Sequence, residues 1–159
     1  MPKFTASVLT ISDSGARGLR QDVSGPEVKR VLEQAGFEVL GAQVVTDDQP
    51  AIEQALIRLC SSSQLVVTTG GTGIAPRDVT PEATLAVADR LVEGVAERMR
   101  AEGGRKAPAA ILSRAVCAVR GSSLILNLPG SPRGAVEFLT SVIDVIPHAL
   151  DLLGGNTVH

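Results

Sequence analysis

The stretch from Leu65 to Ala83 constrains the fold of this chain more than any other segment. Its apolar, β-branched run at residues 65–69 (LVVTT) is typical of a strand that is buried on both faces of a sheet. Three of the next four residues are glycines (GGTG, 70–73). Thr80-Pro81-Glu82 then carries helix-start signals, with Thr as N-cap and Pro at the first helical position. The segment therefore predicts a strand, a glycine loop and a helix in direct succession.

The glycine loop favours a phosphate-binding site. Such a loop between a strand and a helix lets backbone N–H groups approach an anion, and the helix N-terminus adds positive partial charge. The loop matches neither the Walker A motif, because no Lys-Ser or Lys-Thr follows, nor the dinucleotide motif G-x-G-x-x-G. A tight turn that requires positive φ is the alternative. It explains one or two glycines better than three followed by Arg77-Asp78.

The rest of the chain alternates between strand and helix patterns. Strands are predicted at residues 4–11, 37–45, 65–69, 115–119 and 124–128, and helices at 24–34, 47–60, 81–89, 92–102 and 131–146. Ser24 and Glu27 form a capping-box pattern, residues 103–106 read as a turn or loop, and Pro147 kinks the last helix or starts a short one. Gly121 marks a hairpin. The fold class is α/β, a three-layer architecture whose mostly parallel sheet has helices on both faces and an antiparallel edge hairpin, in one domain over residues 1–159.

Acidic residues follow several of these predicted strands. Asp13, Asp47 and Asp78 come after the first three, and Asn127 lies near the end of a late one. Because the carboxyl ends of parallel strands share one edge of a sheet, these groups are expected around one crevice. Carboxylates beside a phosphate site are typical of Mg²⁺, which binds carboxylate and phosphate oxygens and keeps several waters. Further anion contacts are expected from three arginines, Arg77, Arg114 and Arg133.

Ordinary structural roles compete with these site roles. Asp47 or Asp48 also fits a helix cap, and Asp13 and Asp78 also fit turn chemistry. Asn127 is either a hydrogen-bonded core amide or a site residue. Spacing alone leaves open whether Ser113 and Arg114 lie in a plain loop or in a site.

Composition excludes several functional classes. The net charge of −2, the lack of Trp and Tyr and the presence of only three Phe argue against binding nucleic acid or an anionic membrane. No apolar run approaches the roughly 20 residues that span a bilayer, and no signal peptide is recognisable. A cytoplasmic protein is therefore expected. Cys60 and Cys117 fit buried thiols, although a disulfide between them stays open.

Five motifs, in this order, resemble the molybdopterin-binding MogA/MoaB family, whose fold also forms the G domain of gephyrin and its plant counterpart. They are VLTISD (8–13), TGGTG (69–73), RDVTPEA (77–83), ILSR (111–114) and LNLPGSP (126–132). The resemblance extends over residues 4–153, and RDVTPEA is more similar to the MogA branch. Residues 74–76 (IAP) replace a stretch that is more basic in some members.

The resemblance implies Mg²⁺-dependent adenylylation of molybdopterin by ATP, which gives adenylyl-molybdopterin and pyrophosphate. It also implies a homotrimer that hands its product to a molybdenum insertase. Asp47 and Asp78 match the family's catalytic and metal-binding acidic residues. The candidate residues for pterin and nucleotide binding, from these motifs and the strand ends, are Ser12, Asp13, Ser14, Thr69, Gly70, Gly71, Thr72, Gly73, Arg77, Thr80, Pro81, Ser113, Arg114, Asn127, Pro129, Gly130 and Ser131.

Three other functions compete with this one. The first is a non-catalytic molybdopterin carrier or scaffold, against which the intact acidic residues argue. The second is a detached insertase-type domain, which the shortness of the chain disfavours. The third is an unrelated nucleotide-dependent phosphotransferase, which would bind Mg²⁺ and ATP without a pterin.

Overall fold

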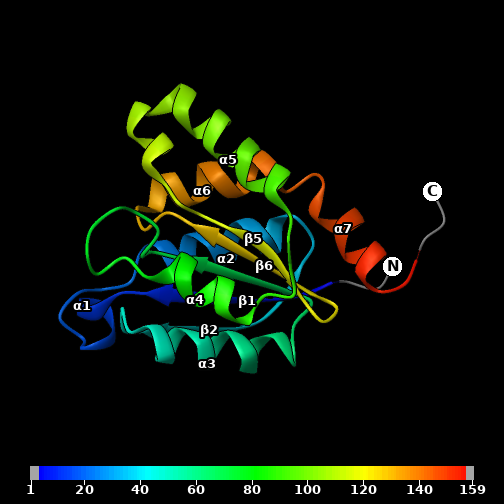
Figure 1. The fold of residues 1–159 in the computed structure, drawn as a ribbon, viewed down its shortest axis with the longest axis horizontal. Coiled ribbons are helices and arrows are strands. Elements are labelled where there is room, and N and C mark those ends of the chain that lie inside the picture. The colour runs from blue at the N-terminus through cyan, green and yellow to red at the C-terminus, as the bar shows by residue number, and fades with distance from the viewer. Residues whose placement is uncertain (1–3, 157–159) are drawn as a thin grey trace.

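A six-stranded sheet in the order β2-β1-β3-β6-β5-β4 forms the centre of the molecule (Figure 1). The computed structural model describes residues 4–156, so both ends of the predicted 1–159 domain lie outside the described residues. β1 (Thr5–Ile11), β2 (Glu38–Val45), β3 (Leu65–Thr69) and β6 (Ser123–Leu128) are parallel. β5 (Cys117–Arg120) and β4 (Arg90–Leu91) add an antiparallel edge. The predicted sheet and its hairpin at Gly121 are therefore confirmed.

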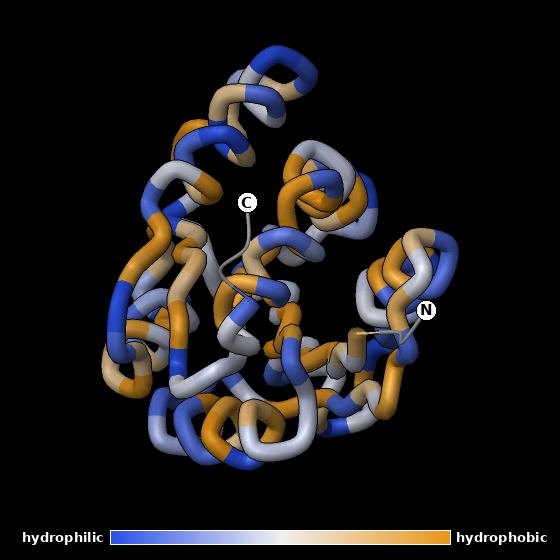
Figure 2. Tube along the Cα trace, turned by 90° about the vertical axis from the view of Figure 1, so that its right-hand side faces the viewer, coloured by the Kyte–Doolittle hydropathy of each residue, from blue (hydrophilic) through white to orange (hydrophobic). Residues whose placement is uncertain are grey.

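Helices cover both faces of this sheet, as predicted. One face packs against α2 (Ser24–Gln34), α5 (Glu93–Lys106), α6 (Pro132–Val142) and α7 (Ile146–Leu153), and the other against α3 (Gln49–Cys60) and α4 (Thr80–Val87). Neighbouring strand residues divide between the two cores, Val67 facing the first and Val66 the second. This alternation follows from the two-residue period of a strand. Hydrophobic and hydrophilic residues alternate along each helix (Figure 2), as expected for amphipathic helices.

Two short elements complete the chain. They are α1 (Asp13–Ala16), directly after β1, and a 3₁₀ helix, η1 (Pro108–Leu112), in a segment that the sequence left ambiguous. Pro147 lies in the first turn of α7, so it starts a further helix. Within residues 4–156 no helix is long and apolar enough to cross a membrane. Cys60 and Cys117 are free thiols, and burial raises the pKa of Cys60 to about 11 and that of Cys117 to about 12.

The predicted turn at residues 103–106 is wrong, because α5 continues to Lys106. Two adjacent glycines usually disfavour a helix interior. Here a Cβ atom at Gly103 would lie 2.4 Å from the Phe138 ring, so glycine allows α5 to pack closely against α6. The contact between the helices therefore outweighs the local propensity.

Two predicted N-caps are also wrong. The N-cap position of α2 is Val23, and the side chain that accepts an amide of the first turn is Asp22, from Gly25, and not Ser24. Thr80 lies inside α4, and its hydroxyl donates to the Gly70 carbonyl at 2.9 Å. Ser131 does cap α6, as predicted.

Candidate functional site

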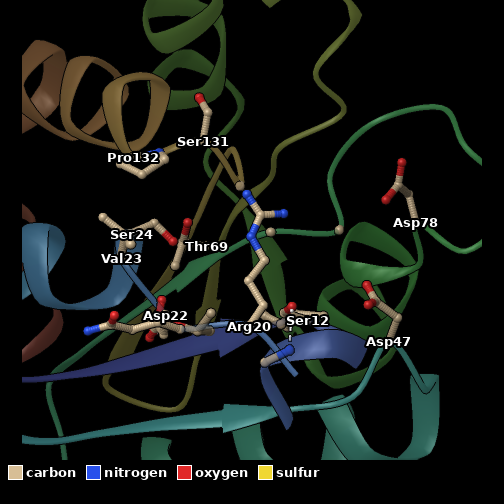
Figure 3. Close-up of a pocket in the computed structure, with 17 residues that line it drawn as sticks. Ser12, Arg20, Asp22, Val23, Ser24, Asp47, Thr69, Asp78, Ser131 and Pro132 are labelled. Atoms are coloured by element: carbon tan, nitrogen blue, oxygen red, sulfur yellow. Dashed lines mark hydrogen bonds between the residues drawn. The ribbon is translucent and has the colours of Figure 1, made fainter. Parts of the chain in front are cut away.

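A pocket of about 510 Å³ opens at the carboxyl ends of β1, β3 and β6 (Figure 3). Strand order reverses at β1, which lies between β2 and β3, and ligands of open α/β sheets bind at such switch points. Of the predicted site residues, those that line this pocket are Ser12, Asp47, Thr69, Gly70, Gly71, Asp78, Gly130 and Ser131. The structure therefore brings together ends of strands that lie far apart in the sequence.

The glycine loop needs glycine at two positions for different reasons. Gly70 has φ +104, and a Cβ atom there would lie 2.3 Å from the Ile11 carbonyl oxygen. Gly71 has φ +70, and its Cβ would lie 2.3 Å from the Thr80 hydroxyl. Positive φ and close backbone approach both exclude larger residues. The alternative of a tight turn is thus correct for these two residues, and it is compatible with a binding role.

Two carbonyl groups of this loop accept hydrogen bonds from backbone amides elsewhere in the chain. Gly71 O accepts from the Thr80 amide at 3.1 Å, and Thr72 O accepts from the Arg114 amide at 2.7 Å. Within residues 4–156, no protein group accepts a hydrogen bond from the amides of Gly71, Thr72 or Gly73. The loop therefore has backbone donors that could bind an anion, and the phosphate-binding role stays a prediction.

Arg114 braces the same loop. Its guanidinium donates to the carbonyls of Gly73 and Asp78, each at 2.8 Å, and to Glu82 at 2.5 Å. The hydrogen bond with Glu82 raises the pKa of Arg114 and lowers that of Glu82. The expected anion contact is therefore replaced by a structural role, because these protein acceptors occupy the guanidinium.

The two other expected anion contacts are also paired within the protein. Arg77 forms an ion pair with Asp13, its Nε donating at 3.1 Å, and this pairing raises the Arg77 pKa. Arg133 pairs with Glu137 at 3.0 Å on the surface of α6.

The ends of β1 and β2 are joined by a reciprocal pair of hydrogen bonds. The Asp13 amide donates to the Asp47 carboxylate, and the Asp47 amide donates to the Asp13 carboxylate, both at 2.9 Å. The hydrogen bond from the Asp47 amide, followed by that from Arg77, lowers the pKa of Asp13. Burial raises the pKa of Asp47, and the negative charges of Asp13 and Asp78 add to this effect. Two neighbouring carboxylates thus have opposite pKa shifts.

The Asp47 and Asp78 carboxylates lie beside the glycine loop, on one side of the pocket (Figure 3). A Cβ atom at Gly71 would lie 3.4 Å from Asp47 Oδ1, and one at Gly73 would lie 2.8 Å from Asp78 Oδ2. Each carboxylate accepts a backbone amide through its Oδ2, so each Oδ1 can still bind a ligand. Within the described part of the chain no group of three ligating side chains forms a complete metal site. Two carboxylates beside backbone amides that could bind phosphate nevertheless fit Mg²⁺, which completes its shell with waters and phosphate oxygens.

A second, more apolar hollow of about 540 Å³ adjoins the first pocket. The two share Gly71, Asp78, Gly130 and Ser131, so the glycine loop lies between them. The predicted residues that line only the second hollow are Thr72, Gly73, Ser113 and Pro129. Phe138 and Leu112 provide an apolar wall. The arrangement offers room for two ligands whose ends meet at the loop amides.

Several predicted residues line neither hollow. They are Asp13, Ser14, Arg77, Thr80, Pro81, Arg114 and Asn127. Asn127 is fully buried, where it donates to the Thr68 and Thr84 hydroxyls at 3.0 Å and accepts from the Val116 amide at 3.1 Å. The alternative of a core amide is therefore the correct one. Of the neighbours Asp47 and Asp48, it is Asp48 that caps α3, because its carboxylate accepts a hydrogen bond from the Ala51 amide.

Sequence reasoning missed one wall of the pocket. Residues 20–24 lie next to the end of β1, where the Thr10 hydroxyl donates to Asp22, and Arg20, Gln21 and Asp22 line the pocket together with Thr10. This segment shows neither helical nor strand periodicity. Its only signal is a clustering of polar residues between the first strand and the next helix.

Comparisons with known proteins agree with this geometry. The family model described as "Probable molybdopterin binding domain" matches residues 7–148. A molybdopterin adenylyltransferase from Helicobacter pylori is 42% identical, covering 98% of this chain and 91% of that protein. The Escherichia coli K12 protein of the same name is also 42% identical, covering 98% and 88%.

Solved structures give the same result. The molybdopterin biosynthesis enzyme MoaB from Thermus thermophilus is 50% identical, with a TM-score of 0.90 over 96% of this chain and 97% of that one. The Mog protein from Mycobacterium ulcerans is 41% identical, with a TM-score of 0.90 over 98% and 99%. Relatives therefore carry the names of both branches, and the chain belongs to the molybdopterin-binding domain family.

Proposed function

We propose that this chain is a molybdopterin adenylyltransferase of molybdenum cofactor biosynthesis. It would transfer AMP from ATP to the terminal phosphate of molybdopterin and release pyrophosphate. The observation that carries the proposal is the glycine loop, whose unpartnered amides lie beside Asp47 and Asp78 at the junction of two hollows. The curated relatives that bear this enzyme name span nearly the whole chain, which supports the assignment.

The proposed reaction depends on positioning. An oxygen of the molybdopterin phosphate attacks the α-phosphorus of ATP, and the bond from that phosphorus to the pyrophosphate oxygen breaks. Holding two phosphate groups in line supplies much of the rate enhancement in such transfers. The amides of Gly71, Thr72 and Gly73 would hold phosphate oxygens. The hydrogen bond from Arg114 to the Gly73 carbonyl would keep those amides directed towards the pocket.

Asp47 and Asp78 would hold Mg²⁺ through their Oδ1 atoms, directly or through water. The cation, when bound, neutralises charge that develops on the leaving pyrophosphate. The Arg77–Asp13 pair and the reciprocal Asp13–Asp47 hydrogen bonds would keep Asp47 in place. Asp13 is thus proposed to position Asp47 and not to touch the substrate.

Pyrophosphate release from ATP, molybdopterin and Mg²⁺ tests the function directly. Asp78→Asn is expected to lose most of this activity while keeping its thermal unfolding midpoint and its molybdopterin affinity. Asp151→Asn, which removes the same charge from an exposed position on α7, is the matched control. Wild-type turnover in Asp78→Asn would refute the assigned role, and a wild-type chain without turnover would refute the activity.

The remaining expectations belong to the same proposal. We propose a single cytoplasmic domain that works as a homotrimer and passes its product to a molybdenum insertase. The non-catalytic carrier is the second candidate, because a relative with 50% identity bears the name of the MoaB branch. Molybdopterin binding without pyrophosphate release would favour that candidate.

A further inference from the structure

Arg20 differs from the arginines that the sequence singled out. Arg77, Arg114 and Arg133 each form an ion pair with a carboxylate. Over the part of the chain that the structure describes, Arg20 has neither an ion pair nor a hydrogen-bond partner. It nevertheless lines the same pocket as Asp22, Asp47 and Asp78. A guanidinium without a protein acceptor is available to an anionic ligand.

The Arg20 side chain extends across the pocket. Figure 3 shows it running from the segment next to the end of β1 towards the ends of the central strands, with its guanidinium pointing in the direction of Ser131. Thr69 and the glycine loop line the same space. The guanidinium therefore faces the volume in which the loop amides would hold a phosphate.

The segment that carries Arg20 is fixed at both ends. On one side, Ser12 caps α1 by accepting from the Gly15 amide at 3.0 Å, and the Leu19 amide donates to the Ser14 carbonyl at 2.9 Å. On the other side, Asp22 accepts from the Thr10 hydroxyl at 2.9 Å and from the Gly25 amide at 3.0 Å. Both anchors lie at the end of β1. The backbone around Arg20 is therefore fixed beside the pocket by its neighbours, so ligand binding needs to order the side chain but not the segment.

We propose that Arg20 is a substrate-binding residue whose guanidinium contacts a phosphate group bound in this pocket beside the glycine loop. This inference rests on the proposed function and adds a residue to it. A phosphate would then be held by neutral amide donors and by a full positive charge. Such a contact suits either the polyphosphate of the nucleotide or the phosphate of the pterin, and the experiment below distinguishes them.

The test compares Arg20→Gln, Arg20→Lys and the control Arg17→Gln in the full chain. Arg17, the C-cap residue of α1 three positions before Arg20, carries the same charge but does not line the pocket. Dissociation constants are measured by calorimetry for ATP, for molybdopterin and for inorganic pyrophosphate, each at two salt concentrations. Steady-state pyrophosphate release gives kcat and the KM for each substrate.

Arg20→Gln should weaken binding of one phosphate-bearing ligand by about tenfold to hundredfold, as loss of a charge-assisted hydrogen bond predicts. The corresponding KM should rise more than kcat falls, and salt should weaken binding less than in the wild type. Arg20→Lys should recover part of the affinity, and Arg17→Gln should match the wild type. The substrate whose affinity changes identifies the source of the phosphate.

Two results separate this inference from the proposed function. A wild-type chain that turns over, combined with unchanged dissociation constants and KM values in Arg20→Gln, would overturn the role of Arg20 alone. A wild-type chain that binds pyrophosphate through Arg20 without any turnover would support the contact and refute the enzyme activity. An equal thermal unfolding midpoint for all variants shows that folding does not cause the difference.

Discussion

Asp13 and Asp47 each donate a backbone amide to the carboxylate of the other, both at 2.9 Å. This pair joins the ends of β1 and β2 and places Asp47 in the wall of the pocket. The two adjacent carboxyl groups nevertheless have opposite pKa shifts: burial raises the pKa of Asp47, whereas the hydrogen bond from the Asp47 amide and then that from Arg77 lower the pKa of Asp13. The consequences can be measured through ionisation, metal binding and stability.

The first prediction concerns the ionisation of Asp47. Its pKa should lie above the ordinary value of 3.8, and that of Asp13 should lie below it. Asp78→Asn should lower the Asp47 pKa, because it removes a neighbouring negative charge. Carboxyl-carbon NMR titration measures both groups in one experiment. A titration midpoint for Asp47 below that of Asp13 would contradict the prediction.

The same shifts fix the signs of two pH effects. Folded Asp47 binds its proton more tightly than the unfolded chain does, so its contribution to stability falls as pH rises from 3.8 through the raised pKa. The contribution of Asp13 has the opposite sign, and it is lost as pH falls below 3.8. The proposed Mg²⁺ site needs ionised Asp47, so metal affinity should begin to fall at a pH above the ordinary pKa of aspartate.

The second prediction separates two glycines of one loop. Gly73→Ala would place a Cβ atom 2.8 Å from Asp78 Oδ2, a flexible side-chain end that can move away. It should therefore cost less than about 1 kcal/mol of stability yet lower activity by about tenfold or more, because small displacements of catalytic groups are costly. Pyrophosphate release and urea unfolding measure the two effects.

Gly70→Ala is the contrasting variant. Its Cβ would meet the Ile11 backbone at 2.3 Å, and its φ of +104 is unfavourable for alanine. A loss of about 2 kcal/mol or more of unfolding free energy is expected, since the backbone must shift. Equal stability of the two alanine variants would contradict this account of the loop.

Sequence periodicity predicted the layers of this fold because long apolar patterns reflect burial, which is what the sheet and its helices share. Periodicity predicted local structure less well where a contact with a residue far away in the sequence determines it. Asp22 rather than Ser24 serves the start of α2, because the Thr10 hydroxyl on β1 holds the Asp22 side chain. The glycine pair in α5 is helical because Phe138, on another helix, packs against Gly103.

Some residues of the candidate site could likewise be predicted from the sequence, and others could not. Asp47, Asp78 and the glycine loop were predictable because parallel strands bring their carboxyl ends to one edge. Arg20 lies on a segment without periodicity, so nothing local indicated its direction. Asn127 could have been placed correctly from strand parity, since it alternates with Leu126 and Leu128 and therefore faces α4.

The third prediction tests the structural role of Asn127. Asn127→Ala leaves the Val116 amide without its partner and opens a cavity between β6 and α4. A loss of about 2–4 kcal/mol in unfolding free energy is expected from the unsatisfied groups and the lost packing. Urea unfolding measures it, with the exposed Gln54→Ala on α3 as the control. A loss of activity without a loss of stability would instead favour a site role.

The fourth prediction concerns the brace formed by Arg114 and Glu82. Arg114 donates to the Gly73 and Asp78 carbonyls and to Glu82, so we expect Glu82 to help orient its guanidinium toward the loop. The pKa of Glu82 is lowered by this hydrogen bond, so the stabilisation is present above the ordinary value of 4.5 and is lost as pH falls through the lowered pKa. The Arg114 side chain is 37% exposed and that of Glu82 is 43% exposed, so solvent screening limits the stabilisation to about 0.2–1 kcal/mol.

Glu82→Gln should therefore be less stable than the wild type at about pH 7, and this gap should shrink at an acidic pH below 4.5, as the lowered pKa of Glu82 is approached and its charge is lost. Its kcat/KM should fall, because the loop amides lose part of their support. The exposed Glu97, for which no ion pair is found within the described residues, provides the control Glu97→Gln, expected to stay within about 0.5 kcal/mol. Urea unfolding at both pH values measures the difference. A stability gap that persists unchanged at the acidic pH would show that charge on Glu82 does not hold Arg114 against the loop.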